Sequence, residues 1–219
     1  MIIAIDGPAG AGKSTVAKIL AKRLGFLYID TGSMYRALTL KVLKNNVSIN
    51  DEQKIIQLAN GIKIDLHNNP DGSLTVFLDG EDVSSAIREP RITQHVSDVA
   101  KIKDVRSVLV QMQREFGRKK DCVLDGRDIG TVVFPQAEKK FFIDASAGVR
   151  VQRRFKELEG LGQLIAENDV ARDLANRDKI DSTRLASPLC QAPDAIYIDT
   201  SSLSIEQVVE TMFGMIKHG

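Results

Sequence analysis

The sequence has few residues that could form disulfides or structural metal sites. Its two cysteines, Cys122 and Cys190, are too few for a disulfide framework and form neither a CxxC motif nor a Cys/His pattern. We expect both to be reduced, as buried small residues or free thiols. His67, His95 and His218 show no paired ligand spacing, so we expect no structural metal.

Neither a strong charge of one sign nor a targeting segment is present. The 30 basic and 29 acidic residues leave a net charge of +1, which gives no reason to expect nucleic acid or an acidic membrane as a partner. Met1 leads straight into an apolar run, with no basic segment and no small-residue cleavage site. We therefore expect a soluble cytoplasmic monomer, although a near-neutral total can still contain a local cluster of arginines.

The distribution of apolar residues predicts an α/β fold. The 219 residues, 43% of them hydrophobic, suffice for one large domain with a small inserted lobe. Short apolar runs without alternation recur between helical patterns, at residues 2–5, 26–29, 122–124, 141–143 and 196–198. Such runs are typical of strands buried on both faces, as in a parallel sheet flanked by helices.

The helical patterns are clear at both ends of the chain. The first helix places Val16, Ile19, Leu20 and Leu24 on one face. The last helix opens with Ser204 as its N-cap and has Gln207 three residues later, which predicts a reciprocal capping box.

Two segments interrupt the alternation of strands and helices. Residues 62–66 and 74–78 alternate apolar and polar side chains on either side of a turn-forming stretch. This pattern predicts an antiparallel hairpin, and so a small β lobe inserted into the parallel core. Glu159–Gln163 separates two helical patterns, and we expect it to hinge a mobile lid.

Residues 7–14, GPAGAGKS, match the phosphate-binding pattern G-x4-G-K-[ST] between a predicted strand and a predicted helix. Glycines let the backbone N–H groups point at a polyphosphate, and the helix adds its positive N-terminal end. Lys13 can neutralise the β- and γ-phosphates, and the Ser14 hydroxyl can bind Mg²⁺. The predicted nucleotide site comprises Gly7, Pro8, Ala9, Gly10, Ala11, Gly12, Lys13, Ser14 and Thr15.

Such loops serve GTPases, motors and kinases alike. A GTPase normally carries an N/T-K-x-D motif, but the segments around Lys63 and Lys179 lack the preceding Asn or Thr. A chain of 219 residues leaves little room for the additional parts of a motor. A small kinase remains as the interpretation.

Three further polar clusters could face the same site. Residues 30–36 and 125–130 follow predicted strands, so they should lie at the carboxyl edge of the sheet, where ligands bind. Arg177, Asp181 and Arg184 lie at i, i+4 and i+7 of one predicted helix. The alternatives are an exposed Arg177–Asp181 ion pair, worth about 0.3–0.5 kcal/mol, and a surface role for Arg127.

These motifs together closely resemble the bacterial cytidylate kinase family. The resemblance rests on IDGPAGAGKS at 5–14, DTGSMYR at 30–36, DGRDIGTVVFP at 125–135, and Arg177, Asp178, Asp181, Arg184, Pro188 and Leu189. It covers almost the whole chain and implies a P-loop NTPase-type parallel sheet with an inserted antiparallel β lobe and a helical lid. The implied division is a core at 1–30, 98–150 and 185–219, an NMP-binding region at 31–97 and a lid at 151–184. The implied reaction is transfer of the γ-phosphoryl group of ATP, with Mg²⁺, to CMP or dCMP.

The resemblance also implies roles for individual residues. It assigns the acceptor phosphate to Arg36, Arg127 and Arg184, the base to Ser97, Arg106 and Asp128, and the ribose to Arg177 and Asp181, with Thr31 and Tyr35 in the same site. The expected catalytic residues are Lys13, Arg127, Arg184 and Arg153. Arg150, Arg153 and Arg154 would approach the ATP phosphates, with no choice among them. Thr31 stands where many relatives have serine, which also offers a hydroxyl.

The residue types fit these roles on chemical grounds. Guanidinium forks match phosphate oxygens, and phosphoryl transfer needs positioning and charge neutralisation rather than a nucleophilic side chain. A carboxylate beside an arginine complements the amino donor and the acceptors of cytosine, so Asp128 and Arg106 have the right chemistry. The alternatives are a P-loop kinase for UMP, AMP or shikimate, and a non-enzymatic nucleotide-binding protein.

Overall fold

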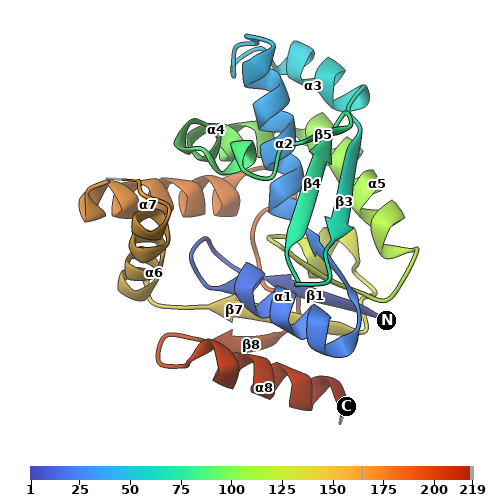
Figure 1. The fold of residues 1–219 in the computed structure, drawn as a ribbon, viewed down its shortest axis with the longest axis vertical. Coiled ribbons are helices and arrows are strands. Elements are labelled where there is room, and N and C mark those ends of the chain that lie inside the picture. The colour runs from blue at the N-terminus through green and yellow to red at the C-terminus, as the bar shows by residue number, and fades with distance from the viewer. Residues whose placement is uncertain (164, 218–219) are drawn as a thin grey trace.

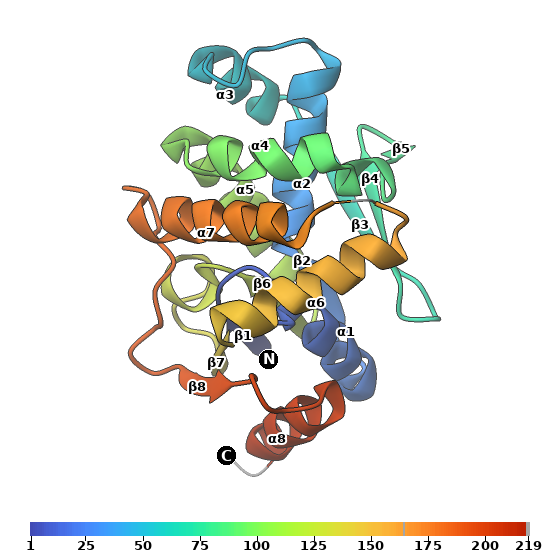
Figure 2. The same ribbon diagram turned by 90° about the vertical axis from the view of Figure 1, so that its left-hand side faces the viewer.

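The computed structural model describes residues 1–163 and 165–217, so His218 lies outside the described residues. Its central sheet has five parallel strands in the order β2-β6-β1-β7-β8 (Figure 1 and Figure 2). The strands are β1 Ile2–Asp6, β2 Leu27–Asp30, β6 Cys122–Gly126, β7 Lys139–Asp144 and β8 Ile196–Asp199. All five strands predicted from the sequence are therefore confirmed. In the described part of the chain, no helix is both long and apolar enough to span a bilayer.

Eight α-helices surround the two sheets in the described residues. They are α1 Lys13–Leu24, α2 Thr31–Lys44, α3 Glu52–Asn60, α4 Pro90–Ala100, α5 Lys103–Gly117, α6 Ala147–Gly160, α7 Glu167–Thr183 and α8 Ile205–Lys217. The predicted capping box of α8 is confirmed, because the Gln207 amide donates to Ser204 Oγ at 3.2 Å and the Ser204 amide donates to Gln207 Oε1 at 2.8 Å.

Both faces of the parallel sheet are buried, as the unalternated apolar runs predict. In β1, Ile3 and Ile5 pack with α1 and α8, while Ala4 packs on the opposite face with α2 and α5. Val16 of α1 belongs to this core, but Ile19 is 41% exposed. The prediction that Ile19 joins the apolar face was wrong, because that flank of α1 lines the large cleft.

The inserted lobe contains the predicted antiparallel hairpin, and a short third strand that the sequence analysis did not predict extends it. It consists of β3 Ile64–Asn68, β4 Leu74–Leu78 and β5 Glu81–Asp82. Its inward residues Leu66, Val76 and Leu78 belong to the same core cluster as α2 and α4. The hairpin tip reaches α1 (Figure 1), where Lys22 Nζ donates to the Asp71 carbonyl at 3.3 Å.

Helices α6 and α7 lie across the carboxyl edge of the parallel sheet, with α7 running beside α4 (Figure 2). The predicted interruption is confirmed: α6 ends at Gly160, Gly162 has a φ of 72°, and α7 begins at Glu167. Leu158, Val170 and Leu174 pack around Ala9 of the phosphate-binding loop. This small apolar cluster ties the two helices to the loop, and a hinge at 159–163 remains a prediction.

Candidate active site

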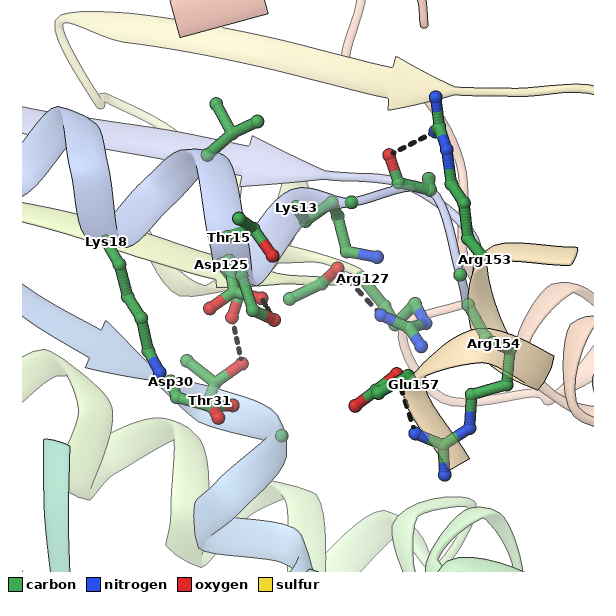
Figure 3. Close-up of a pocket in the computed structure, with 18 of the residues that line it drawn as sticks. Lys13, Thr15, Lys18, Asp30, Thr31, Asp125, Arg127, Arg153, Arg154 and Glu157 are labelled. Carbon is green, nitrogen blue, oxygen red and sulfur yellow. Dashed lines mark hydrogen bonds and ion pairs between the residues drawn. The ribbon is translucent and has the colours of Figure 1, made fainter. Parts of the chain in front are cut away.

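A large cleft of about 910 Å³ opens at the carboxyl ends of β1, β2 and β6 (Figure 3). The predicted site residues line it, with the exception of Gly7, Pro8 and the lid candidate Arg150. Its described walls carry twelve lysines and arginines against six aspartates and glutamates. Because the whole chain has a net charge of only +1, the basic residues are concentrated at this cleft.

Gly7 and Pro8 do not line the cleft, but their contacts stabilise the conformation of the phosphate-binding loop. Gly7 has a φ of 146°, and a Cβ at this position would lie 1.9 Å from the Ile143 carbonyl oxygen, so only glycine fits. The Pro8 carbonyl accepts a hydrogen bond from Lys13 Nζ at 2.6 Å. Gly12, with a φ of 89°, is the N-cap of α1 and turns the chain into the helix.

Lys13 is only 5% exposed, and its ammonium group lies at the end of the loop near Arg127. Burial, together with the positive charge of Arg127, lowers the pKa of Lys13 to about 7. An anion bound between these two cations would restore the charged form. A phosphate-binding role for Lys13 remains a prediction that this environment favours.

Two acidic residues lie beneath the loop, at the ends of neighbouring strands. Asp125 in β6 accepts a hydrogen bond from Ser14 Oγ at 2.7 Å. Burial raises the pKa of the Asp125 carboxyl, and the nearby Asp30 raises it as well. A cation bound next to Asp125 would favour its charged form. Among the described residues no group of three or more His, Cys, Asp or Glu could hold a metal alone, so a cation here would need the phosphates as further ligands.

The opposite wall contains a row of buried residues with alternating charge. Arg106 Nη2 donates to Asp128 Oδ2 at 2.5 Å, and Arg184 lies 3.8 Å from the other oxygen of Asp128. Arg184 Nη1 donates to Asp181 Oδ1 at 3.4 Å, and Arg127 Nε donates to Asp181 Oδ2 at 2.8 Å. We call these five side chains the charged network. Residues from α5, from the end of β6 and from α7 are thereby held together.

The charged network corrects two expectations about residues 177–184. Asp181 is 5% exposed and pairs with Arg127 and Arg184, whereas Arg177 lies 3.9 Å from Asp173. The alternative of an exposed Arg177–Asp181 ion pair is therefore wrong. Arg184 does not lie on the helix either: α7 ends at Thr183, and Arg184 has an extended conformation with ψ 142° that turns its side chain back into the cleft wall.

Helix α2 carries the remaining predicted acceptor residues. Asp30 caps α2 by accepting from the Ser33 amide at 2.8 Å, and its other oxygen accepts from Arg36 Nη2 at 3.0 Å. The Thr31 hydroxyl donates to the Asp125 carbonyl at 2.7 Å, which fixes the start of α2 against β6. The Tyr35 ring lies 5.2 Å from the Arg106 guanidinium, and burial raises the pKa of Tyr35 to about 12.

Several buried polar atoms around this wall have no hydrogen-bond partner among residues 1–163 and 165–217. They include the Tyr35 hydroxyl, Nε of Arg36, Arg106 and Arg177, and Nη2 of Arg184. Buried donors without partners are costly, so they mark places where a ligand or a small rearrangement can add hydrogen bonds. Ser97 of α4 completes this side of the cleft and is 6% exposed.

The three lid arginines have different environments. Arg150 does not line the cleft, because its guanidinium pairs with Asp178 and donates to the Ala9 carbonyl at 3.0 Å. Arg153 lines the cleft and donates to Thr200 Oγ1 at 2.9 Å, while Arg154 pairs with Glu157 at 2.9 Å (Figure 3). A catalytic role for Arg153 remains a prediction.

Some cleft residues were not singled out from the sequence. Asp125 belongs to the motif at 125–135, but no role was predicted for it. It lies near the end of β6, which pairs with the strand that leads into the phosphate-binding loop, and this position could have predicted its place beside the loop. Lys18 and Lys22 of α1 also line the cleft, as do Asp71 of the hairpin and Thr200 after β8. The sequence offers no signal for these residues, because they enter the cleft through tertiary packing.

The parallel sheet, the phosphate-binding loop and the facing arginines together define a P-loop kinase. Among solved structures, the fold is similar to an uncharacterised protein from Eubacterium ventriosum, with a TM-score of 0.56, 14% identity, and coverage of 100% of this chain and 99% of the other. It is also similar to a gluconokinase from Sinorhizobium meliloti, with a TM-score of 0.51, 10% identity, and coverage of 98% and 90%. Both likenesses show the fold alone.

Sequence comparison defines the family. The family model for cytidylate kinase matches residues 3–218. The chain is 53% identical to the cytidylate kinase of Caldanaerobacter subterraneus subsp. tengcongensis, covering 98% of this chain and 94% of the relative. It is 47% identical to the cytidylate kinase of Clostridioides difficile, covering 99% and 98%. The chain belongs to the cytidylate kinase family.

The low pKa of Lys13 can be tested directly. With ¹³C-labelled lysine, one side-chain resonance should titrate near pH 7 in the free protein, because burial and Arg127 disfavour the ammonium form. Lys13→Arg should remove that resonance and so assign it. Since the group loses its charge as the pH rises through 7, anion affinity should fall over the same range. A Lys13 resonance that titrates near 10 would contradict the prediction.

Proposed function

We propose that this protein transfers the γ-phosphoryl group of ATP to CMP or dCMP, which yields ADP and CDP or dCDP. The observation that carries the proposal is the concentration of basic residues in one cleft between the phosphate-binding loop and the charged network. A triphosphate and a monophosphate bring several negative charges into that space, and the twelve basic residues of its walls balance them.

The ATP phosphates would be held by residues 7–15. The loop amides and the N-terminus of α1 face the cleft, and Lys13 lies at its end. We propose Mg²⁺ as the metal, with Ser14 as the ligand from this chain and Asp125 holding the Ser14 hydroxyl. When bound, Mg²⁺ would draw charge from the β- and γ-phosphate oxygens.

The acceptor phosphate would be held by Arg36, Arg127 and Arg184. Arg127 and Arg184 each use part of the guanidinium on Asp181, and Arg36 uses one nitrogen on Asp30. Arg127 Nη1 and Arg184 Nε also donate to the carbonyls of Gly126 and Ser187. Nη2 of Arg184 and Nε of Arg36 have no partner among the described residues and are available for phosphate oxygens, which guanidinium groups match well. By fixing the acceptor oxygen in line with the γ-phosphorus, these residues would supply the positioning on which phosphoryl transfer depends.

The base would meet Ser97, Arg106 and Asp128. The Arg106–Asp128 pair holds the carboxylate rigidly, with both side chains less than 7% exposed. A fixed carboxylate accepts the N4 amino hydrogen of cytosine, whereas the O4 of uracil would face it as a second acceptor. Arg177 and Asp181 would meet the ribose, with Thr31 and Tyr35 in the same site.

The proposal also covers the division of the chain into regions, the lid arginine and the partners. We propose that residues 31–97 form the NMP-binding region, that 151–184 form the lid, and that Arg153 acts on the transferred phosphoryl group. Only small molecules are needed as substrates, so we propose a monomer without nucleic acid or membrane partners. An exposed free thiol at Cys190 fits the reducing cytoplasm.

A panel of monophosphates tests the function. With ATP and Mg²⁺, coupled detection of ADP should show rapid turnover of CMP and dCMP, and slower turnover of UMP and AMP. Shikimate should give no turnover, because it carries no phosphate dianion for the three arginines. A preference for UMP, AMP or shikimate would replace the proposed substrate, and ATP binding without turnover of any acceptor would favour a non-enzymatic nucleotide-binding protein.

Arg127→Lys should lower kcat/KM for CMP by at least about tenfold, or roughly 1.4 kcal/mol. Lysine keeps the charge but loses the fork that grips two oxygens, and misplacing the acceptor slows an in-line reaction. ATP affinity and the urea midpoint should be almost unchanged. Arg91→Lys, at an exposed arginine paired with Glu89, is the control. Normal kinetics would show that Arg127 does not grip the acceptor phosphate, and unfolding would make it a structural partner of Asp181.

Asp128→Asn should reduce the discrimination between CMP and UMP, measured as the ratio of their kcat/KM values. The asparagine amide can donate to the O4 of uracil, while the carboxylate can only accept. Asp98→Asn, in an exposed pair with Lys101, should leave the ratio unchanged. If Asp128→Asn retains the wild-type ratio while folding normally, then Asp128 does not read the base.

A further inference from the structure

Tyr28 in β2 lies behind the cleft and is only 2% exposed. Its hydroxyl donates to Asp125 Oδ1 at 2.7 Å. The other carboxylate oxygen, Oδ2, accepts from Ser14 Oγ at 2.7 Å. The two oxygens of Asp125 therefore have different partners, one in the core and one in the phosphate-binding loop.

This arrangement fixes the orientation of the Ser14 hydroxyl. Two hydrogen bonds to opposite oxygens set the plane of the Asp125 carboxylate. With its hydrogen directed at Asp125, Ser14 Oγ turns its lone pairs away from the carboxylate, toward a cation bound with the phosphates. We propose that Tyr28 is a positioning residue for that cation, acting through Asp125 on Ser14, and the proposal rests on the metal site assigned under the proposed function.

The inserted lobe holds Tyr28 in place. The Asn68 side chain, at the end of β3, accepts from the Tyr28 amide at 2.8 Å and donates to the Tyr28 carbonyl at 3.0 Å. Because β2 is an edge strand of the parallel sheet, these two bonds occupy backbone groups that no neighbouring strand pairs. Asn68, Tyr28, Asp125 and Ser14 thus form one continuous chain of hydrogen bonds from the lobe to the loop.

A purely structural role for Tyr28 makes a different prediction. Its ring belongs to the core cluster with Val16 and Leu20, so the residue could serve packing alone. Tyr28→Phe keeps the ring and removes only the hydroxyl. Packing alone would leave metal-dependent nucleotide binding unchanged, whereas the positioning role requires it to weaken.

The experiment measures ATP affinity by calorimetry in excess Mg²⁺ and again in EDTA, using the full chain. The ratio of the two affinities is the strengthening that Mg²⁺ provides. In Tyr28→Phe this ratio should fall about tenfold, the lower end of the effect expected when an outer partner of a metal site is removed. ATP affinity in EDTA and the affinity for CMP should stay at wild-type values. Tyr197→Phe, at a tyrosine that is 51% exposed, is the matched control.

A second set of variants identifies the route. If Tyr28 acts through Asp125, Tyr28→Phe should have no further effect on the ratio once Asp125→Asn is present. If Tyr28→Phe does not fold, Asn68→Ala, which removes both bonds to the Tyr28 backbone but leaves the core ring in place, should lower the ratio in the same direction. An unchanged ratio, or an equal loss in EDTA and in Mg²⁺, would overturn the positioning role. A wild-type protein whose ATP affinity does not respond to Mg²⁺ would instead overturn the proposed metal site.

Discussion

The structure of the cleft depends on the charged network formed by Arg106, Asp128, Arg184, Asp181 and Arg127. Four of these side chains are at most 7% exposed, so none of their charges could stay there alone. Removing one partner of a buried pair typically costs about 3–5 kcal/mol, because the other charge is left without compensation. The network therefore fixes the relative positions of α5, the end of β6 and the end of α7.

The network also explains how a cleft can hold so many arginines before any substrate binds. Each carboxylate neutralises part of two guanidinium groups, which leaves other N–H groups free in fixed directions. Donors fixed in this way need little reorganisation when charge develops on a transferred phosphoryl group, and this is the condition for strong electrostatic stabilisation. The protein thus uses its acidic residues mainly to position basic ones.

The β lobe is held against the parallel-sheet core by side-chain hydrogen bonds as well as by its two chain connections. Asn68 bonds the backbone of Tyr28 on the free edge of β2, and the hairpin tip meets Lys22 on α1. These contacts place the lobe beside both the loop and the acceptor side of the cleft. The inserted β lobe therefore forms part of the cleft wall.

The strands, the hairpin and the phosphate-binding loop could be predicted from the amino-acid sequence alone. They depend on local periodicity and on residues such as Gly7, where the backbone conformation admits only glycine. The sequence also provided the motifs that carry the family resemblance. The ion-pair partners could not be predicted from the sequence and depend on tertiary packing. Asp181 pairs with Arg127 and Arg184 rather than with Arg177, and Arg150 pairs with Asp178. The hydrogen bonds that join Asn68 to Tyr28 and Tyr28 to Asp125 likewise follow from tertiary packing alone. Spacing along one helix fixes which side chains share a face, but pairing between elements depends on how the sheet and helices pack.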